Sequence, residues 1–400
     1  MTCSEPTPRG CPAIPGSGRR LIGRALVVAL VALPGVTAVA AAPPIQSDFS
    51  NRAVLVELPE TRPLPEPPAS NQGLAERVRY HLRQAQQLGD PRQLGYAQRL
   101  LVAWPGPTFN AELRLLRARL NQSLHEFDAA RADLAHVQAH SQRPGERYEA
   151  TLLLATLALA QGHYLEAGEA CQTLIQLRAD LLAHSCQALA TGRSGRPAQA
   201  YHTLRQALRQ ARTSEAHQLA WALGSLAELA DQLALETAGS HWQSALLLTP
   251  DDLYLRSQLV DWHLRRGQPG AALALTEGYI QVDGLAVLRA VALGQTGHDQ
   301  QAVALTQRLA QRFSEALWRG NLLHRREYAR YLLDVVQQPE QALTQARLNW
   351  QQQREPADTR LLLRAAQATG DSSVSRQVGR WRDSQGSHQS RDPAPGPNGG

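Results

Sequence analysis

Apolar residues recur three and four positions apart over long stretches of the chain, and short turn segments separate these stretches. This spacing places the apolar side chains on one face of an α-helix. The pattern is fullest from Trp242 onward, where Trp242, Ala245 and Leu246 share a face. Pro250–Asp252 ends that helix and caps the next one, and Gly267 turns the chain back. The stretch therefore predicts two helices joined by a tight turn.

A glycine followed five residues later by an alanine marks this unit along the chain. The glycine can take the positive φ that ends a first helix, and the alanine lets the second helix approach the first closely. The complete pairs are Gly162…Ala167, Gly195…Ala200, Gly267…Ala272 and Gly297…Ala302, and another residue precedes the alanine in His125…Ala130, Leu233…Ala238 and Gln337…Ala342. With Gly95 as the first, these small residues lie roughly 34 positions apart, the period of a helix–turn–helix repeat.

In these pairs, in the helix end at Ala245–Asp252 and in Tyr164, the chain resembles the tetratricopeptide repeat (TPR) family. The resemblance covers residues 72–383, as about eight units and a final helix pair from Asp358 to Asp383. It implies an all-α fold, a right-handed α-solenoid of TPR-like repeats whose first helices line a concave groove. It also implies the binding of peptides or proteins without catalysis. A helical superhelix of another repeat type is the alternative.

The composition agrees with an all-helical protein that is not an enzyme. Leu and Ala, which favour helices, dominate the 43% of hydrophobic residues, and the chain has only 4 Phe and 1 Met. All 41 basic residues are arginine, so no lysine serves a Walker A loop or a Schiff base. No G-x-S-x-G, H-E-x-x-H, G-x-G-x-x-G or C-x-x-C pattern occurs. We therefore expect no catalytic residues and no cofactor.

The formal net charge of +6 does not indicate a nucleic-acid partner. Residues 1–40 contribute a net +3 through four arginines and one glutamate, which leaves +3 for the other 360 residues. No run of five basic residues occurs, so a field that attracts nucleic acid is not expected.

The first 40 residues have the three regions of a signal peptide. Arg19, Arg20 and Arg24 precede the nine apolar residues Ala25–Leu33, and an A-x-A processing signal ends at Ala40. We expect an exported bacterial protein in the periplasm. It would be anchored in the inner membrane, and so in contact with a membrane, only if the segment is not cleaved.

Two further segments flank the repeats. Residues 41–71 are rich in proline and predict an extended linker. Residues 384–400 are rich in Ser, Pro and Gly and predict a disordered tail.

Three sets of residues are candidates for a site or a cross-link. Cys171 and Cys186 lie in neighbouring predicted helices and form either a disulfide or two buried thiols. His136 and His140 are four positions apart and are weak metal-ligand candidates, with two solvated histidines as the alternative. Polar positions of first helices are candidates for contacts in the groove: Arg114, Asn121, Asp261 and Arg265.

These features favour a non-catalytic scaffold in the cell envelope that binds a peptide or protein partner in its concave groove. The central units, roughly residues 148–310, have the most regular spacing and are the expected binding region. A helical accessory component of a cell-wall enzyme system and a helical-repeat RNA binder are the alternatives.

Overall fold

The computed structural model describes residues 68, 70–106, 108–211, 215–320 and 322–386. They all belong to one compact unit, Glu66–Gly400. The predicted signal peptide at residues 1–40 lies outside the described residues. So do the predicted linker and tail, except at their inner ends, where the first helix begins at Asn71 and the last ends at Gly386.

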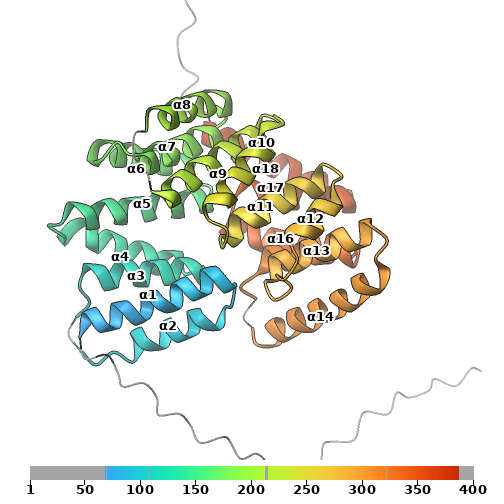
Figure 1. The fold of residues 1–400 in the computed structure, drawn as a ribbon, viewed down its shortest axis with the longest axis horizontal. Helices are drawn as coiled ribbons and strands as arrows, with labels where there is room; N and C mark the ends of the chain where they lie inside the picture. Colours follow the sequence, from blue (N-terminus) through green and yellow to red (C-terminus); the bar gives the residue numbers. More distant parts are fainter. Residues whose placement is uncertain (1–67, 69, 107, 212–214, 321, 387–400) are drawn as a thin grey trace, which may run out of the picture. The chain divides into compact units, whose positions relative to one another are not determined.

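The predicted fold class is confirmed, because the described residues form eighteen α-helices and one π-helical segment, with no strand. The helices form consecutive hairpins (Figure 1). The hairpins are α1 (Asn71–Leu88) with α2 (Arg92–Val102), α3 (Ala111–Ser123) with α4 (Phe127–His140), α5 (Pro144–Gln161) with α6 (Tyr164–Leu177), α7 (Leu181–Arg193) with α8 (Pro197–Gln210), α9 (Ala216–Gln232) with α10 (Thr237–Leu248), α11 (Leu253–Arg265) with α12 (Pro269–Leu275), α13 (Asp283–Gln295) with α14 (Asp299–Trp318), α15 (Arg325–Arg330) and the π-helical η1 (Tyr331–Val335) with α16 (Pro339–Gln352), and α17 (Pro356–Thr369) with α18 (Ser372–Gly386).

Local signals place the turns. Asp252 caps α11 by accepting a hydrogen bond from the Leu255 amide at 2.9 Å. Gly162 ends α5 at a φ of +77°, as its spacing predicts. One turn residue was predicted one position too early, because Leu233 has a φ of −88° and Ala234 takes the positive φ of +54°. The residue with positive φ therefore lies four positions before Ala238 instead of five.

Six of the eight small positions are fully buried between helices, and two are not. Gly95 is partly exposed, and a Cβ atom added there would meet no heavy atom within 4 Å, so Ala97 is the buried small residue of α2. Ala302 is also partly exposed and only borders the core around α13 and α14. The six buried positions are Ala130, Ala167, Ala200, Ala238, Ala272 and Ala342.

Packing is mostly between neighbours in the sequence. Consecutive first helices contact one another in most hairpins, while second helices pack on the first helices before and after them. The core is divided accordingly into separate clusters, such as one shared by α5, α6 and α7. This is the quasi-one-dimensional packing of a solenoid, in which the first helices lie on the inner side. None of the described helices is both long enough and apolar enough to cross a membrane.

Candidate functional site

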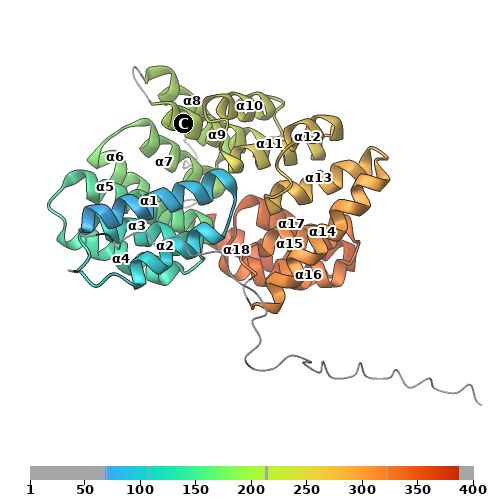
Figure 2. The same cartoon turned by 60° about the horizontal axis from the view of Figure 1, so that its bottom comes forward.

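The last helices return to the middle of the array and pack against the edge where the first helices end. We call this edge the turn rim. Figure 2 shows α15 to α18, coloured orange to red, among the earlier hairpins. The residues of the turn rim come from five successive hairpins: His125, Gly162, Ser194, Asp231 and Arg265.

Arg354, at the junction of α16 and α17, makes the central contact with the turn rim. Its backbone N–H donates to the Ala160 carbonyl at 2.7 Å, and its own carbonyl accepts from the Tyr164 hydroxyl at 2.8 Å. One residue earlier, the Gln353 amide lies 3.2 Å from Nε2 of His125. These contacts join residues about 190 to 230 positions apart in the sequence.

Trp381 of α18 packs on the same turn. Its ring lies 5.5 Å from the Tyr164 ring and 5.3 Å from the Trp350 ring. A Cβ atom at Gly162 would lie 2.7 Å from Cζ2 of Trp381 and 2.8 Å from Cβ of Arg354. The turn thus needs glycine both for its positive φ and for the close approach of the last helices.

Charged residues join the rim to α15 and α17. Asp261, which is 9% exposed, pairs with Arg265 at 3.0 Å, with Arg330, and with Arg360 at 3.7 Å. Burial favours the neutral acid, but the three guanidinium groups overcome it and hold the pKa of Asp261 well below its usual range. Arg265 also pairs with Asp231 of α9 at 2.9 Å.

The four residues predicted to contact a partner therefore lie in two settings. Asp261 and Arg265 belong to the ion-pair network just described. Arg114 pairs with Asp133 at 3.1 Å inside its own hairpin, and Asn121 is only 9% exposed. Contact between these four residues and a partner stays a prediction.

A groove of about 840 Å³ runs along α6 and α7. We call it the α6–α7 groove. Gly168 and Ala190 lie opposite each other, where a Cβ atom at Gly168 would be 4.0 Å from the Ala190 Cβ. Hydrogen-bonding side chains dominate its lining: Glu169, Gln172, Thr173, Gln176, Gln187, Thr191, Ser194, Arg196 and Gln385.

One polar atom in the groove lacks a partner. The Gln187 amide nitrogen lies 3.4 Å from the Thr191 hydroxyl, but its buried Oε1 accepts no hydrogen bond from the described residues. A buried acceptor without a donor costs about 1–3 kcal/mol. An N–H or O–H group of a ligand in the groove can remove this cost once the Gln187 side chain rotates toward it.

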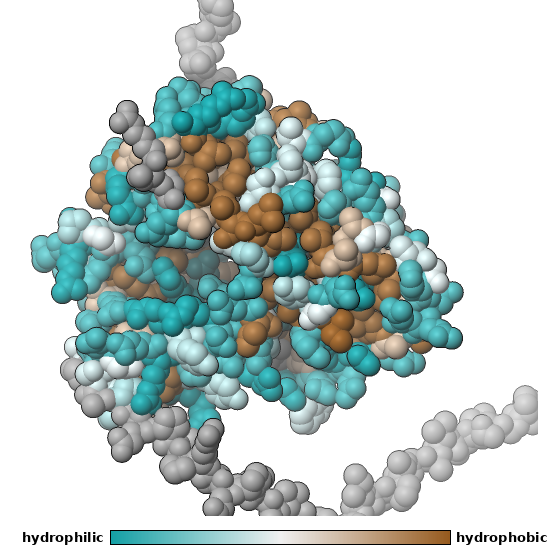
Figure 3. Space-filling model, viewed as in Figure 1, coloured by the Kyte–Doolittle hydropathy of each residue, from teal (hydrophilic) through white to brown (hydrophobic). Residues whose placement is uncertain are grey.

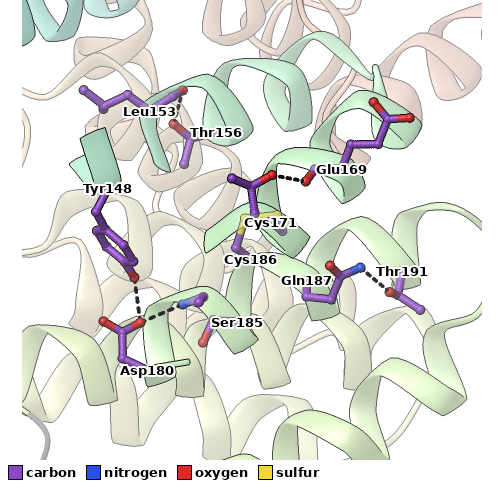
Figure 4. The surroundings of a disulfide bond; sticks show 12 residues. Tyr148, Leu153, Thr156, Glu169, Cys171, Asp180, Ser185, Cys186, Gln187 and Thr191 are labelled. Atoms are coloured by element: carbon purple, nitrogen blue, oxygen red, sulfur yellow. Dashed lines mark hydrogen bonds between the residues drawn. A yellow bond between two sulfur atoms is a disulfide. The ribbon is translucent and has the colours of Figure 1, made fainter. Parts of the chain in front are cut away.

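A disulfide joins the two helices that form this groove (Figure 4). Cys171 of α6 and Cys186 of α7 have Cα atoms 5.5 Å apart, within the usual range for a disulfide. Of the two alternatives in the sequence, the structure has the disulfide. Each cysteine directly precedes a groove residue, Gln172 or Gln187, so the cross-link fixes the two sides of the groove.

Two further cavities of several hundred Å³ lie among the described residues. The first has about 460 Å³ and an apolar lining from α10, α11 and α12, where α12 is only seven residues long. Figure 3 shows apolar surface in the region of α9 to α12. The second has about 570 Å³ and lies between α1, α3 and the residues around His324 and Gln353. Three of the arginines in its lining pair with carboxylates, for example Arg326 with Glu355.

The two weak metal-ligand candidates lie side by side on α4, and metal binding by them stays a prediction. The rings of His136 and His140 stack with centroids 4.2 Å apart, and Nδ1 of His140 lies 2.9 Å from the His136 carbonyl oxygen. Nowhere in the described ranges do three or more His, Cys, Asp or Glu residues cluster in a way that could hold a metal ion.

Comparisons with known proteins found similar solved structures but no match in sequence. No protein-family model matches the sequence, and no curated protein matches it either. A human IFIT1 dimer with PPP-AAAA is similar in structure with 12% identity and a TM-score of 0.46, over 78% of this chain and 85% of that one. Yeast Tom70 has 12% identity and a TM-score of 0.41, over 79% and 78%. The P58(IPK) TPR domain has 15% identity and a TM-score of 0.21, over 76% and 89%.

Sequence reasoning missed the α6–α7 groove because it looked for contacts on first helices only. The groove draws half of its polar lining from α6, a second helix. A signal was present in the spacing of Glu169, Gln172, Thr173 and Gln176, which recur three and four positions apart and so share one helix face.

Proposed function

We propose that this protein is a non-catalytic scaffold that binds an extended peptide segment of a protein partner in the α6–α7 groove. The observation that carries the proposal is the groove itself, with its amide and hydroxyl lining and the unpartnered Oε1 of Gln187. Amide side chains both donate and accept, so they suit the alternating N–H and C=O groups of a peptide backbone.

Rigidity supports the same function. The disulfide holds α6 and α7 together, and the contacts of Tyr164 with Arg354 and Gln385 hold the start of α6 against the last helices. A groove that is formed before binding loses less entropy when a ligand is bound. The groove lies in the central units, within the region expected from the regular Gly/Ala spacing.

The lining also supports binding rather than catalysis. Glu169 is the one carboxylate among the described lining residues, and these include no histidine or cysteine. General acid–base or nucleophilic catalysis depends on paired groups of these kinds.

We also propose that the protein acts outside the cytoplasm, in the periplasm or on the outer face of the inner membrane. The signal-peptide pattern at residues 1–40 and the disulfide support this location, because disulfides persist in oxidising compartments. N-terminal sequencing of the protein from the envelope fraction tests it. A chain that begins at or just after Ala41 supports export, and an intact Met1 in the soluble cytoplasm contradicts it.

Co-purification with a tagged chain tests the partner and the groove together. A groove variant replaces Gln172, Thr173 and Gln176 by alanine. A matched control replaces two exposed glutamines and one exposed threonine of α8 by alanine, namely Gln199, Thr203 and Gln206, which lie outside the groove.

Alanine favours helix, so both triple variants should keep the fold. The proposal expects a partner that co-purifies with the unmodified chain and with the α8 control but is depleted with the groove variant. Equal recovery with all three chains would show that the partner binds elsewhere.

A further inference from the structure

The last described residue lies inside the α6–α7 groove. Gly386 and Gln385 line one end of it, and a Cβ atom at Gly386 would be 3.6 Å from the Ser194 carbonyl oxygen. Gln385 is held there because its Oε1 accepts from the Tyr164 backbone N–H at 3.1 Å. Residues 387–400, which the structure does not describe, therefore start at the mouth of the groove.

We propose that residues 387–400 bind in the α6–α7 groove as an intramolecular ligand. One consequence of this docking rests on the proposed function: a partner that binds in the groove must displace the segment. The docking itself requires no partner, so it can be tested by itself.

The length of the segment fits. From Tyr164 to Gln176 the groove follows twelve helical steps, or about 18 Å at 1.5 Å per residue. About six extended residues span that distance at roughly 3.3 Å each. Residues 387–392 are enough to follow the groove from end to end, and eight further residues remain.

The composition of the segment fits as well. Its sequence, SHQSRDPAPGPNGG, begins with hydroxyl, imidazole and amide side chains. These groups and the backbone N–H groups of residues 387–392 can supply the donor that Oε1 of Gln187 lacks. The prolines that follow favour an extended backbone, which lowers the entropy lost on docking.

The charges of the segment and of the groove are complementary. Glu169 and Arg196 line the groove, and neither has an ion-pair partner among the described residues. Arg391 and Asp392 are adjacent residues of opposite charge in the segment. Pairing of Arg391 with Glu169 is the contact that a charge reversal tests most simply.

Hydrogen exchange of the full chain, measured by mass spectrometry on peptides that cover residues 387–400, tests the proposal. In the unmodified chain we expect exchange about tenfold slower than that of an unstructured peptide of the same sequence. Glu169→Arg should remove this protection, and Glu169→Arg combined with Arg391→Glu should restore it. Glu340→Arg is the matched control, because Glu340 is exposed in α16, forms no ion pair among the described residues and lies outside the groove.

Exchange at the unstructured rate in the unmodified chain overturns the inference. So does protection that survives Glu169→Arg, because the segment is then docked elsewhere. Neither result affects the proposed function, which depends on the effect of the groove variant on partner recovery. If the segment is protected as expected but no partner depends on the groove, the inference stands and the proposed function fails.

Discussion

Replacing Gly162 by alanine tests the packing of the last helices against the turn rim. The added Cβ atom would lie 2.7 Å from Trp381 and 2.8 Å from Arg354, so one of these residues must move. Overpacking of this kind costs about 1–3 kcal/mol. The positive φ of +77° adds about 1–2 kcal/mol for a residue with a side chain. We expect Gly162→Ala to lower the free energy of unfolding by roughly 2–5 kcal/mol.

Gly297→Ala is the matched control. Gly297 occupies the corresponding turn between α13 and α14 at a φ of +71°, and a Cβ atom there would meet nothing within 4 Å. Gly297→Ala should therefore lower the free energy of unfolding by only the backbone contribution of about 1–2 kcal/mol. Urea unfolding followed by far-ultraviolet circular dichroism measures both variants. Equal losses would mean that Trp381 and Arg354 do not press against Gly162, and would refute the proposed packing at the rim.

Three further outcomes follow from the structure. Ala272→Trp should lower the thermal midpoint more than Ala302→Trp, because Ala272 is fully buried and Ala302 is partly exposed. The reverse order would contradict this placement of the two alanines between the paired helices. Reduction of the disulfide should lower the free energy of unfolding by about 3 kcal/mol for its 15-residue separation, and an unchanged urea midpoint under dithiothreitol would contradict this. Burial lowers the pKa of His324, but the hydrogen bond that its ring Nδ1–H donates to the Asp283 carboxylate at 2.9 Å outweighs burial, so the pKa is raised. The folded chain then holds this proton more tightly, so the contribution of His324 to stability is fully present below about pH 6.5 and is lost as the pH rises through the raised pKa. His324→Gln should flatten that part of the stability profile measured by urea titration.

The fold could be predicted because each hairpin carries its own local signals. Gly162 and the cap at Asp252 act within one turn, and the buried alanines act within one helix pair. The two departures have local causes as well. The turn at Ala234 has no glycine to mark it, and the small residue of α2 is Ala97 rather than Gly95 because the first turn differs from the others.

The return of the last helices could not be predicted in the same way. Arg354 contacts Ala160, and Trp381 contacts Tyr164, across some 200 positions of sequence. Such contacts depend on the curvature of the array, which results from many small rotations between neighbouring hairpins. No single residue or short motif determines that curvature. One end of the α6–α7 groove depends on the same return, because its last lining residues come from the end of α18.

Site-specific photo-crosslinking in living cells tests the central claim most directly. A photoreactive amino acid replaces Gln172 in the α6–α7 groove in one strain, and it replaces Gln206 on α8 in another. Both positions are exposed glutamines of second helices, so they differ mainly in whether they face the groove. We predict that a discrete partner adduct forms at position 172 and not at position 206. An adduct at position 206 with none at position 172 would contradict binding in the groove.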